Sequence, residues 1–295
     1  MSTLNLFRRL FDDAAVFPPG NSPLPHAVSV HLWHRQTNRA VLLGPLVVPA
    51  ADLPRLATIV AETADTMPDH HPAELEDLLG LAVTVPTPLK VGAAVAAARA
   101  VPFARLAALE VAIPNDLQAD QVVPALQAAL GDPAETAVYV EIPRDHRRDP
   151  LLAALSGTRY LAKFRTGGIR ADLYPGEVEL AESLVALAAA GVPFKATAGL
   201  HHALRNTDPE TGFEQHGFLN LLTAANAAIE GADVDKLVPL LADRDGARVA
   251  AAVGRLPAGV RETFRSFGTC SISEPVAELV ALDLLPLDYQ TEIAA

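Results

Sequence analysis

The sequence predicts an α/β protein built as a single closed (β/α)8 barrel, the TIM barrel, and three observations support that fold class. Short apolar segments typical of strands begin roughly 23 to 38 residues apart, which is the period of βα units. Alanine-rich helical stretches separate these segments, and four of the first six after residue 40 end at a proline. No GxGxxG motif follows the first strand, so the pattern favours a closed barrel over an open dinucleotide-binding sheet.

The expected strands are nearly continuous apolar runs, which is typical of parallel strands buried on both faces. In chain order they are FDDAAVFPP (11–19), VLLGPLVVP (41–49), LGLAVTVP (79–86), LAALEVAIP (106–114), TAVYVEIP (136–143), YLAKFRTGG (160–168), PFKATAGLHH (193–202) and FRSFGTCSI (264–272). One barrel domain is then expected to cover residues 1–295. Within it, residues 1–40 form an N-terminal segment whose helix, expected over 26–40, packs on the barrel.

Two neighbouring strands in this series each carry a lysine. The run EVELAESLVALAAA (177–190) between them predicts a helix, because it has helical apolar spacing, acidic residues in its first turns and a glycine past its end. A longer helical region is expected from Phe218 to Gly254. Lys163 and Lys195 are 195 − 163 = 32 positions apart, about one βα unit, so we expect both ammonium groups at the same end of adjacent strands.

Composition narrows the classes of partner. The net charge of −12 argues against nucleic acid or an anionic membrane surface, so a small-molecule substrate is expected. The chain has no apolar run long enough for a membrane span or a signal peptide, and its single cysteine agrees with a reducing compartment, which together predict a cytoplasmic protein. The alanine- and arginine-rich, lysine-poor composition resembles a bacterial coding bias. A homodimer is an open possibility, since barrels commonly dimerise.

Polar residues at the carboxyl ends of the expected strands would collect at one mouth of the barrel. They are Glu110, Glu141, Lys163, Arg165, Lys195, Thr197, His201, His202 and Ser271, joined by Thr166, Gly167 and Gly199 in the same turns. Charges inside apolar strands cost several kcal/mol unless they are paired. A structural glutamate–lysine network could explain any one of them, but the whole set favours an active site.

Two adjacent lysines favour one specific chemistry. Each ammonium disfavours the charge of the other, and burial adds to that, so one lysine can be neutral near pH 7 and attack a carbonyl to form a Schiff base. Glu110 or Glu141 would shuttle the proton. The sequence therefore predicts a Schiff-base-forming lyase, acting on a small and anionic carbonyl compound and needing no cofactor.

From residue 41 to 275 the strand series resembles the class I aldolase barrels, most closely the deoxyribose-phosphate aldolase family. KFRTG (163–167) looks like that family's motif KTSTG, KATAG (195–199) like KASGG, and RSFGTCS (265–271) is similar to RIGTSS. EVAIP (110–114) and VEIP (140–143) fall where the family has strands like DVVFP and VIIET. The resemblance implies Lys163 as the Schiff-base lysine, Lys195 as the neighbour that lowers its pKa, and Glu110 as the proton shuttle.

The chain departs from this family at several positions, which predicts a changed substrate. Glu110 replaces an aspartate, and Arg165 stands inside the first motif. Leu200 replaces a glycine whose backbone would hold a phosphate. Arg165 could still bind a carboxylate in bidentate fashion. A sugar phosphate is therefore not the expected substrate.

Two other functions stay open. His201, His202, Glu214 and His216, with Glu110 or Glu141, could form a divalent-metal site in a metal-dependent lyase or isomerase, with the lysines as acid–base groups. The barrel could also bind an anionic ligand through Lys163, Arg165 and Lys195 without catalysis.

Two further features are given structural explanations. Asp12 and Asp13 are expected to cap a helix or lie in a solvated turn rather than face the active site. Cys270 has apolar neighbours and no histidine in its local sequence, so we expect a buried structural thiol rather than a nucleophile.

Overall fold

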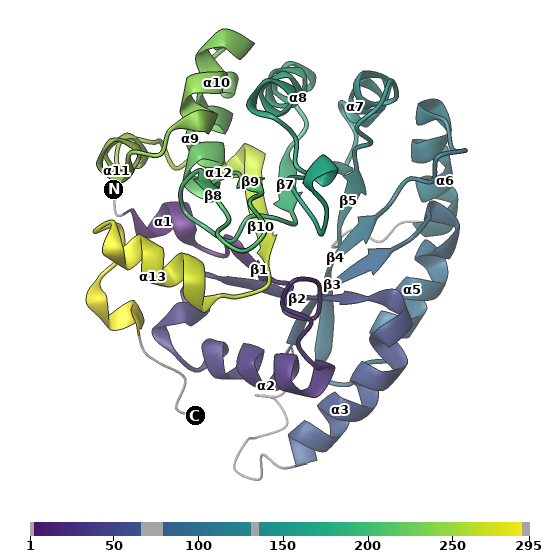
Figure 1. Cartoon of the computed structure of the whole chain (residues 1–295). Coiled ribbons are helices and arrows are strands. Elements are labelled where there is room, and N and C mark those ends of the chain that lie inside the picture. Colours follow the sequence, from purple (N-terminus) through teal and green to yellow (C-terminus); the bar gives the residue numbers. More distant parts are fainter. Residues whose placement is uncertain (1–2, 66–78, 131–135, 291–295) are drawn as a thin grey trace.

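The computed structural model describes residues 3–65, 79–130 and 136–290. Within these residues a closed barrel of parallel strands forms in the order β1-β10-β7-β6-β5-β4-β3-β2, and helices surround it (Figure 1). The predicted (β/α)8 barrel is therefore confirmed. The first strand pairs with both β10 and β2, so it closes the barrel between the last strand of the chain and the second.

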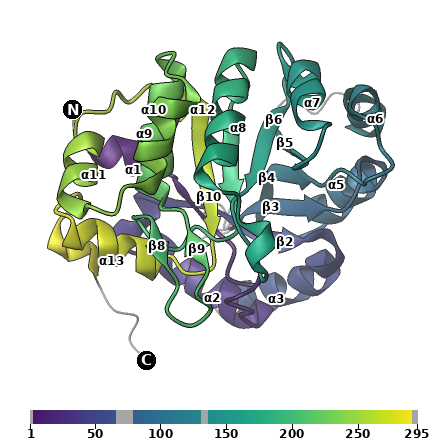
Figure 2. The same ribbon diagram turned by 45° about the horizontal axis from the view of Figure 1, so that its top comes forward.

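Each expected strand is present, but several are shorter than their segments: β1 ends at Asp13, before a turn that begins at Ala15, and β7 ends at Thr197. The barrel strands are β1 (Phe11–Asp13), β2 (Leu43–Pro49), β3 (Leu79–Val85), β4 (Ala104–Val111), β5 (Ala137–Glu141), β6 (Leu161–Arg165), β7 (Phe194–Thr197) and β10 (Phe264–Thr269). A separate antiparallel pair, β8 (Asn206–Thr207) and β9 (Glu214–Gln215), forms in the loop after β7 and lies beside the barrel in Figures 1 and 2.

Helices follow the strands around the outside of the barrel (Figure 2). The α-helices are α1 (Leu4–Phe7), α2 (Leu24–Arg35), α3 (Leu53–Asp65), α5 (Val91–Arg99), α6 (Ala119–Leu130), α7 (Arg148–Leu155), α8 (Glu177–Ala190), α9 (Phe218–Ile229), α10 (Val234–Ala242), α11 (Gly246–Val253), α12 (Val260–Thr263) and α13 (Ser273–Ala281). Short 3-10 turns are η1 (Asn38–Val41), η2 (Ala50–Asp52), η3 (Pro88–Lys90), η4 (Ala171–Leu173) and η5 (Leu287–Gln290).

The helix between the two lysine strands has the predicted bounds, with Gly191 in the left-handed conformation just past its end. The helix expected over 26–40 is α2, which starts earlier and ends at Arg35. The helical region expected from Phe218 to Gly254 is present and consists of three helices, α9, α10 and α11. It breaks because Gly231 takes a positive φ of 87° and Asp233 and Asp245 each cap the start of a new helix.

The apolar core has two parts. The larger part lies between the strands and the surrounding helices and includes a cluster of Phe11, Phe218 and Phe267, whose rings lie 4.9 to 5.7 Å apart. A small second part is inside the barrel, around Val47, Ala82, Ala108 and Tyr139. Branched aliphatic side chains usually fill a barrel interior. Here much of that space is left to polar groups, which form the candidate site.

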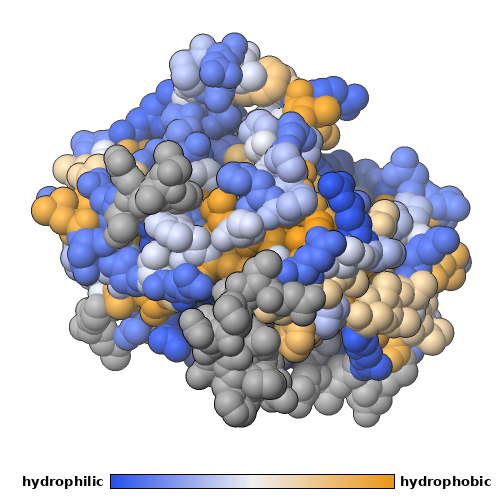
Figure 3. All heavy atoms as spheres, turned by 90° about the horizontal axis from the view of Figure 1, so that it is seen from below, coloured by the Kyte–Doolittle hydropathy of each residue, from blue (hydrophilic) through white to orange (hydrophobic). Residues whose placement is uncertain are grey.

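The surface is mixed in character. In Figure 3, which shows the molecule from below, hydrophilic residues cover most of the face and a band of hydrophobic residues crosses its middle. Such mixing is ordinary, because folded proteins expose much apolar area. Among the described residues, the helices are all too short or too polar to span a membrane.

We predict that Phe267→Ala lowers the free energy of unfolding by about 3 to 5 kcal/mol, because it empties a fully buried site against two other rings. The matched control is Leu89→Ala at a side chain that is 86% exposed, where the change should stay below about 0.5 kcal/mol. Urea denaturation of both variants tests this. Equal effects would contradict the assignment of Phe267 to the core.

Candidate functional site

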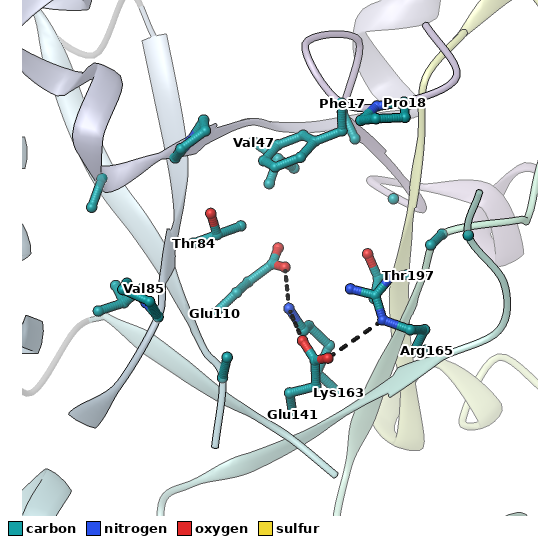
Figure 4. Close-up of a pocket in the computed structure, with 18 of the residues that line it drawn as sticks. Phe17, Pro18, Val47, Thr84, Val85, Glu110, Glu141, Lys163, Arg165 and Thr197 are labelled. Carbon is teal, nitrogen blue, oxygen red and sulfur yellow. Dashed lines mark hydrogen bonds and ion pairs between the residues drawn. The ribbon is translucent and has the colours of Figure 1, made fainter. Parts of the chain in front are cut away.

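Six charged side chains form a chain of alternating sign inside the barrel. Lys195 lies between Asp12 and Glu110, with its Nζ 2.6 Å from Glu110 Oε1. Lys163 lies between two glutamates, with its Nζ 3.2 Å from Glu110 Oε2 and 2.9 Å from Glu141 Oε2. Arg165 completes the chain with its Nε 3.5 Å from Glu141 Oε1 (Figure 4). Three carboxylates thus balance three cations.

The strand register explains why residues so distant in sequence meet. In the strand register, Lys163 lies beside Glu141 of one neighbouring strand and beside Lys195 of the other. Because parallel strands in register turn alternate side chains to the same face, these three residues project into the barrel at one level. Glu110 reaches them from β4, and Asp12 reaches Lys195 from β1, which only β10 separates from β7. The prediction that both lysines lie at one end of the barrel is confirmed.

From Lys195 to Arg165, the exposed fraction of the side chains rises along this charged network. The side chain of Lys195 is 1% exposed and that of Glu110 2%, whereas Lys163 is 6%, Glu141 23% and Arg165 37% exposed. Lys195 and Asp12 therefore form the inner end, and Arg165 forms the outer end. A ligand that enters from the mouth meets Arg165 and Glu141 first and Lys163 next.

The ion pairs perturb the pKa values of the inner groups. Burial alone would raise the pKa of Glu110, but the adjacent Lys195 and Lys163 outweigh it and lower the pKa to about 2. Burial would likewise lower the pKa of Lys195, but Asp12 and Glu110 raise it above its ordinary value. For Glu141, burial is again outweighed, by Lys163 and Arg165, and its pKa is lowered. Glu110 and Glu141 are thus carboxylates at neutral pH, and Lys195 is a fixed cation.

A cavity of about 870 Å³ opens above this network of charged side chains, at the carboxyl ends of the strands. Glu110, Glu141, Lys163, Arg165 and Thr197 line it. Figure 4 shows the charged groups on one side of the cavity and Phe17, Pro18 and Val47 opposite them. Lys195 is not among the residues that line the cavity, in the part of the chain that the structure describes. The two lysines therefore differ in their access to a ligand.

Three of the predicted substrate-binding residues hold the barrel rim together instead. Thr166 is fully buried and donates its hydroxyl hydrogen bond to the carbonyl of Ala198 at 2.6 Å. Gly167 and Gly199 pack against each other, so that a β-carbon on Gly167 would lie 2.8 Å from Gly199 Cα. Gly199 also has a positive φ of 73°. Neither glycine is among the described residues that line the cavity.

Two other residues that were predicted to bind substrate, His202 and Ser271, are not among the described residues that line the cavity. His202 pairs with Glu278 at 2.6 Å, a contact that raises its pKa, and so joins the loop after β7 to α13. The Ser271 hydroxyl accepts a hydrogen bond from the backbone N–H of Glu274 at the start of α13. Both contacts are structural. His201, by contrast, does line the cavity.

The four residues of the alternative metal site do not converge. His216 is fully buried, with its Nε2 2.7 Å from the carbonyl of Pro175, and Glu214 pairs with Arg205 and Arg244. His201 and His202 contact different partners, Cys270 and Glu278. Across residues 3–65, 79–130 and 136–290, no three His, Cys, Asp or Glu side chains are grouped to hold a metal ion. The donor geometry gives this alternative no support.

The expectation for Asp12 and Asp13 was wrong, because both are buried. Asp12 binds Lys195 and accepts a hydrogen bond from Ser266 Oγ at 2.7 Å, while Asp13 lies 3.0 Å from His31 Nδ1. Burial raises the pKa of Asp12 above its ordinary value. The sequence did indicate this burial, because its apolar pattern places residues 11–19 in a strand. Residues of a barrel strand that point inward cannot also lie in a solvated turn.

Tyr139 is a second residue that the sequence did not single out. Its ring centroid lies 5.5 Å from Lys195 Nζ, so it provides a cation–π contact to the inner cation. Burial raises the pKa of its hydroxyl to about 12. Tyr139 therefore remains neutral and helps to hold the Lys195 charge in place.

Cys270 lines the cavity and is half-buried rather than part of the closed core. A histidine from the loop after β7 lies against it, with His201 Nδ1 3.2 Å from Cys270 Sγ. Burial raises the pKa of the thiol to about 11, and burial also lowers the pKa of His201. The neighbouring histidine is thus not an imidazolium that would stabilise a thiolate, and the expectation of an unreactive thiol stays a prediction.

We predict that acid weakens the wild-type fold more steeply than it weakens Glu110→Gln. The pKa of Glu110 falls from 4.5 to about 2 on folding, so its contribution to stability is present above pH 4.5 and is lost as the pH falls toward 2. Asp12 has the opposite sign, since its raised pKa favours the fold below its ordinary value of 3.8. Between pH 5 and pH 3 the wild type should lose about 2 kcal/mol more than the variant.

Urea denaturation at several pH values measures this difference. Both proteins keep Asp12, but the charge of Glu110 is one of the causes that raise the Asp12 pKa, so the stabilising effect of Asp12 in acid is smaller in Glu110→Gln and narrows the difference. Parallel slopes for the two proteins would contradict the assigned pairing of Glu110 with both lysines.

We also predict slow alkylation of Cys270. With its pKa raised to about 11, the thiolate at pH 8 is scarce, and iodoacetamide should modify the native protein roughly 100-fold more slowly than the urea-denatured chain. Intact-protein mass measurement over time gives both rates. Native labelling as fast as that of the denatured chain would show that His201 activates the thiol.

Comparisons with known proteins assign this chain to no family. No protein-family model matches it, and neither does any curated protein. What can be concluded about the site therefore comes from its geometry: a (β/α)8 barrel whose mouth holds an accessible lysine between two carboxylates.

Proposed function

We propose that this protein is a lyase of the aldolase type, which forms a Schiff base between Lys163 and a carbonyl substrate. One observation carries the proposal: Lys163 lines an 870 Å³ cavity and has a carboxylate on either side of its ammonium group. An amine nucleophile needs both access to the carbonyl carbon and a nearby base that takes its proton. Lys163 has both.

Lys195 supports the reaction as a fixed cation rather than as the nucleophile. Its side chain is 1% exposed, it is enclosed by Asp12 and Glu110, and its pKa is raised. Deprotonating it would leave two buried carboxylates without their shared partner, which costs several kcal/mol. The permanent charge of Lys195 instead keeps Glu110 ionised, and it also makes Glu110 a weaker base than an ordinary glutamate.

The proton balance of imine formation fits the two glutamates. The Lys163 ammonium first gives a proton to Glu141 or Glu110, and the neutral amine then adds to the carbonyl carbon. A carboxyl group returns protons to the former carbonyl oxygen, which leaves as water. Two of the three ammonium protons depart in that water, and one stays on the iminium nitrogen. No other reactant is required.

After imine formation, cleavage of a carbon–carbon bond would place its electron pair on the iminium, and a glutamate would accept the proton from the leaving fragment. Arg165 lies at the outer end of the charged chain, where its guanidinium could hold an anionic group of the substrate. Thr197 lines the same cavity and offers a hydroxyl. The resemblance of residues 163–167 and 195–199 to class I aldolase motifs points to the same chemistry.

We predict that borohydride traps an adduct on Lys163. The protein is incubated with a panel of small aldehydes, ketones and 2-oxo acids, reduced, and analysed by intact and peptide mass spectrometry. One equivalent of adduct should appear on Lys163 and none on Lys195. Lys163→Met should abolish the adduct, while Lys90→Met, at an exposed lysine that also lines the cavity, should leave it unchanged.

Two results would contradict the proposal. Adducts spread over several surface lysines would mean that Lys163 has no special reactivity. Tight binding of a carbonyl compound with no adduct and no turnover would favour a binding protein instead.

A further inference from the structure

We propose that the substrate carries an extended apolar arm, which lies along the uncharged half of the cavity while its carbonyl end faces Lys163. This inference rests on the proposed function for the position of the carbonyl group. It adds the substrate class: an amphiphilic carbonyl compound with an alkyl chain, rather than a small sugar-like molecule. Three features of the cavity carry it.

The first feature is the division of the lining by element. The charged side chains come from β4, β5 and β6, on one side. The other side is formed by the ends of β2 and β3, by α5 and by the turn after β1, which contribute mainly apolar residues: Phe17, Val47, Val85, Pro86, Ala94 and Ala97. Figure 4 shows this separation, with Phe17 and Val47 across the cavity from Glu141 and Lys163.

The second feature is the scarcity of polar groups on that side. Thr84 is there, and Lys90 lies at the exposed rim, where its stem can lie along an apolar chain with the ammonium in water. A polyhydroxylated substrate arm would lose hydrogen bonds to water on this surface without replacing them, at a cost of a few kcal/mol. An alkyl arm loses none.

The third feature is size. At roughly 30 Å³ for each water-sized group, a carbonyl compound of ten non-hydrogen atoms would fill only about a third of the 870 Å³ cavity. The remaining volume is bounded by small side chains, since α5 presents alanines at positions 93, 94 and 97 to it. A chain that extends from Lys163 toward α5 would occupy this space and bury apolar surface on both partners.

Binding of linear saturated carboxylates from butanoate to decanoate, measured by isothermal titration calorimetry, tests this inference. These probes cannot form an imine, so the result does not depend on the lyase reaction. The dissociation constant should fall roughly two- to fourfold with each added methylene group until the arm fills the cavity. Ala97→Phe should weaken decanoate binding at least tenfold and leave butanoate binding unchanged.

The matched control is Ala96→Phe, at an exposed alanine of the same helix that is not among the lining residues. It should bind the whole series as the wild type does. Ala93→Phe provides a second test at an exposed lining position, should Ala97→Phe fold poorly. Affinity that is independent of chain length would overturn the inference.

The outcomes separate this inference from the proposed function. A Lys163 adduct together with chain-length-independent binding overturns the apolar arm and leaves the Schiff-base lyase standing. Chain-length-dependent binding without any Lys163 adduct supports the amphiphilic ligand and removes the lyase.

Discussion

The alternating chain of Asp12, Lys195, Glu110, Lys163 and Glu141 is the interaction on which the rest of the site depends. None of its inner members could be buried alone, because an unpaired charge in a protein interior costs several kcal/mol. Each is tolerated because it has an opposite charge on at least one side. Removing any inner member would therefore affect all the others, and the site forms as a unit.

Such a charged network adds little to the free energy of folding, because well-packed apolar side chains of similar volume often give equal or greater stability. The apolar cluster inside this barrel is small, centred on Val47, Ala82, Ala108 and Tyr139. The fold is instead stabilised from outside, where the larger core packs between strands and helices. This division leaves the interior available for chemistry, which is where ionisable groups with perturbed pKa values usually gather in enzymes.

The gradient of exposure along the chain gives its members different roles. At the inner end Lys195 is a fixed cation beside Asp12, and the outer residue Arg165 is open to the cavity. Lys163 stands between them, where it is shielded from bulk water yet lines the cavity. The same cavity is charged on one side and apolar on the other. A molecule that fits it would match both surfaces with its two ends.

The barrel could be predicted from the sequence, since the spacing and composition of its apolar runs are local properties. The same runs showed which strand ends carry Glu110, Glu141, Lys163 and Lys195. The break between the helices α9 and α10 also had local signals in Gly231 and Asp233. The pairing of the charges, in contrast, depends on the tertiary structure. It brought Asp12 to Lys195 and placed Gly167 against Gly199, because contacts between the strands of a closed barrel depend on strand register and tilt, which no local pattern specifies.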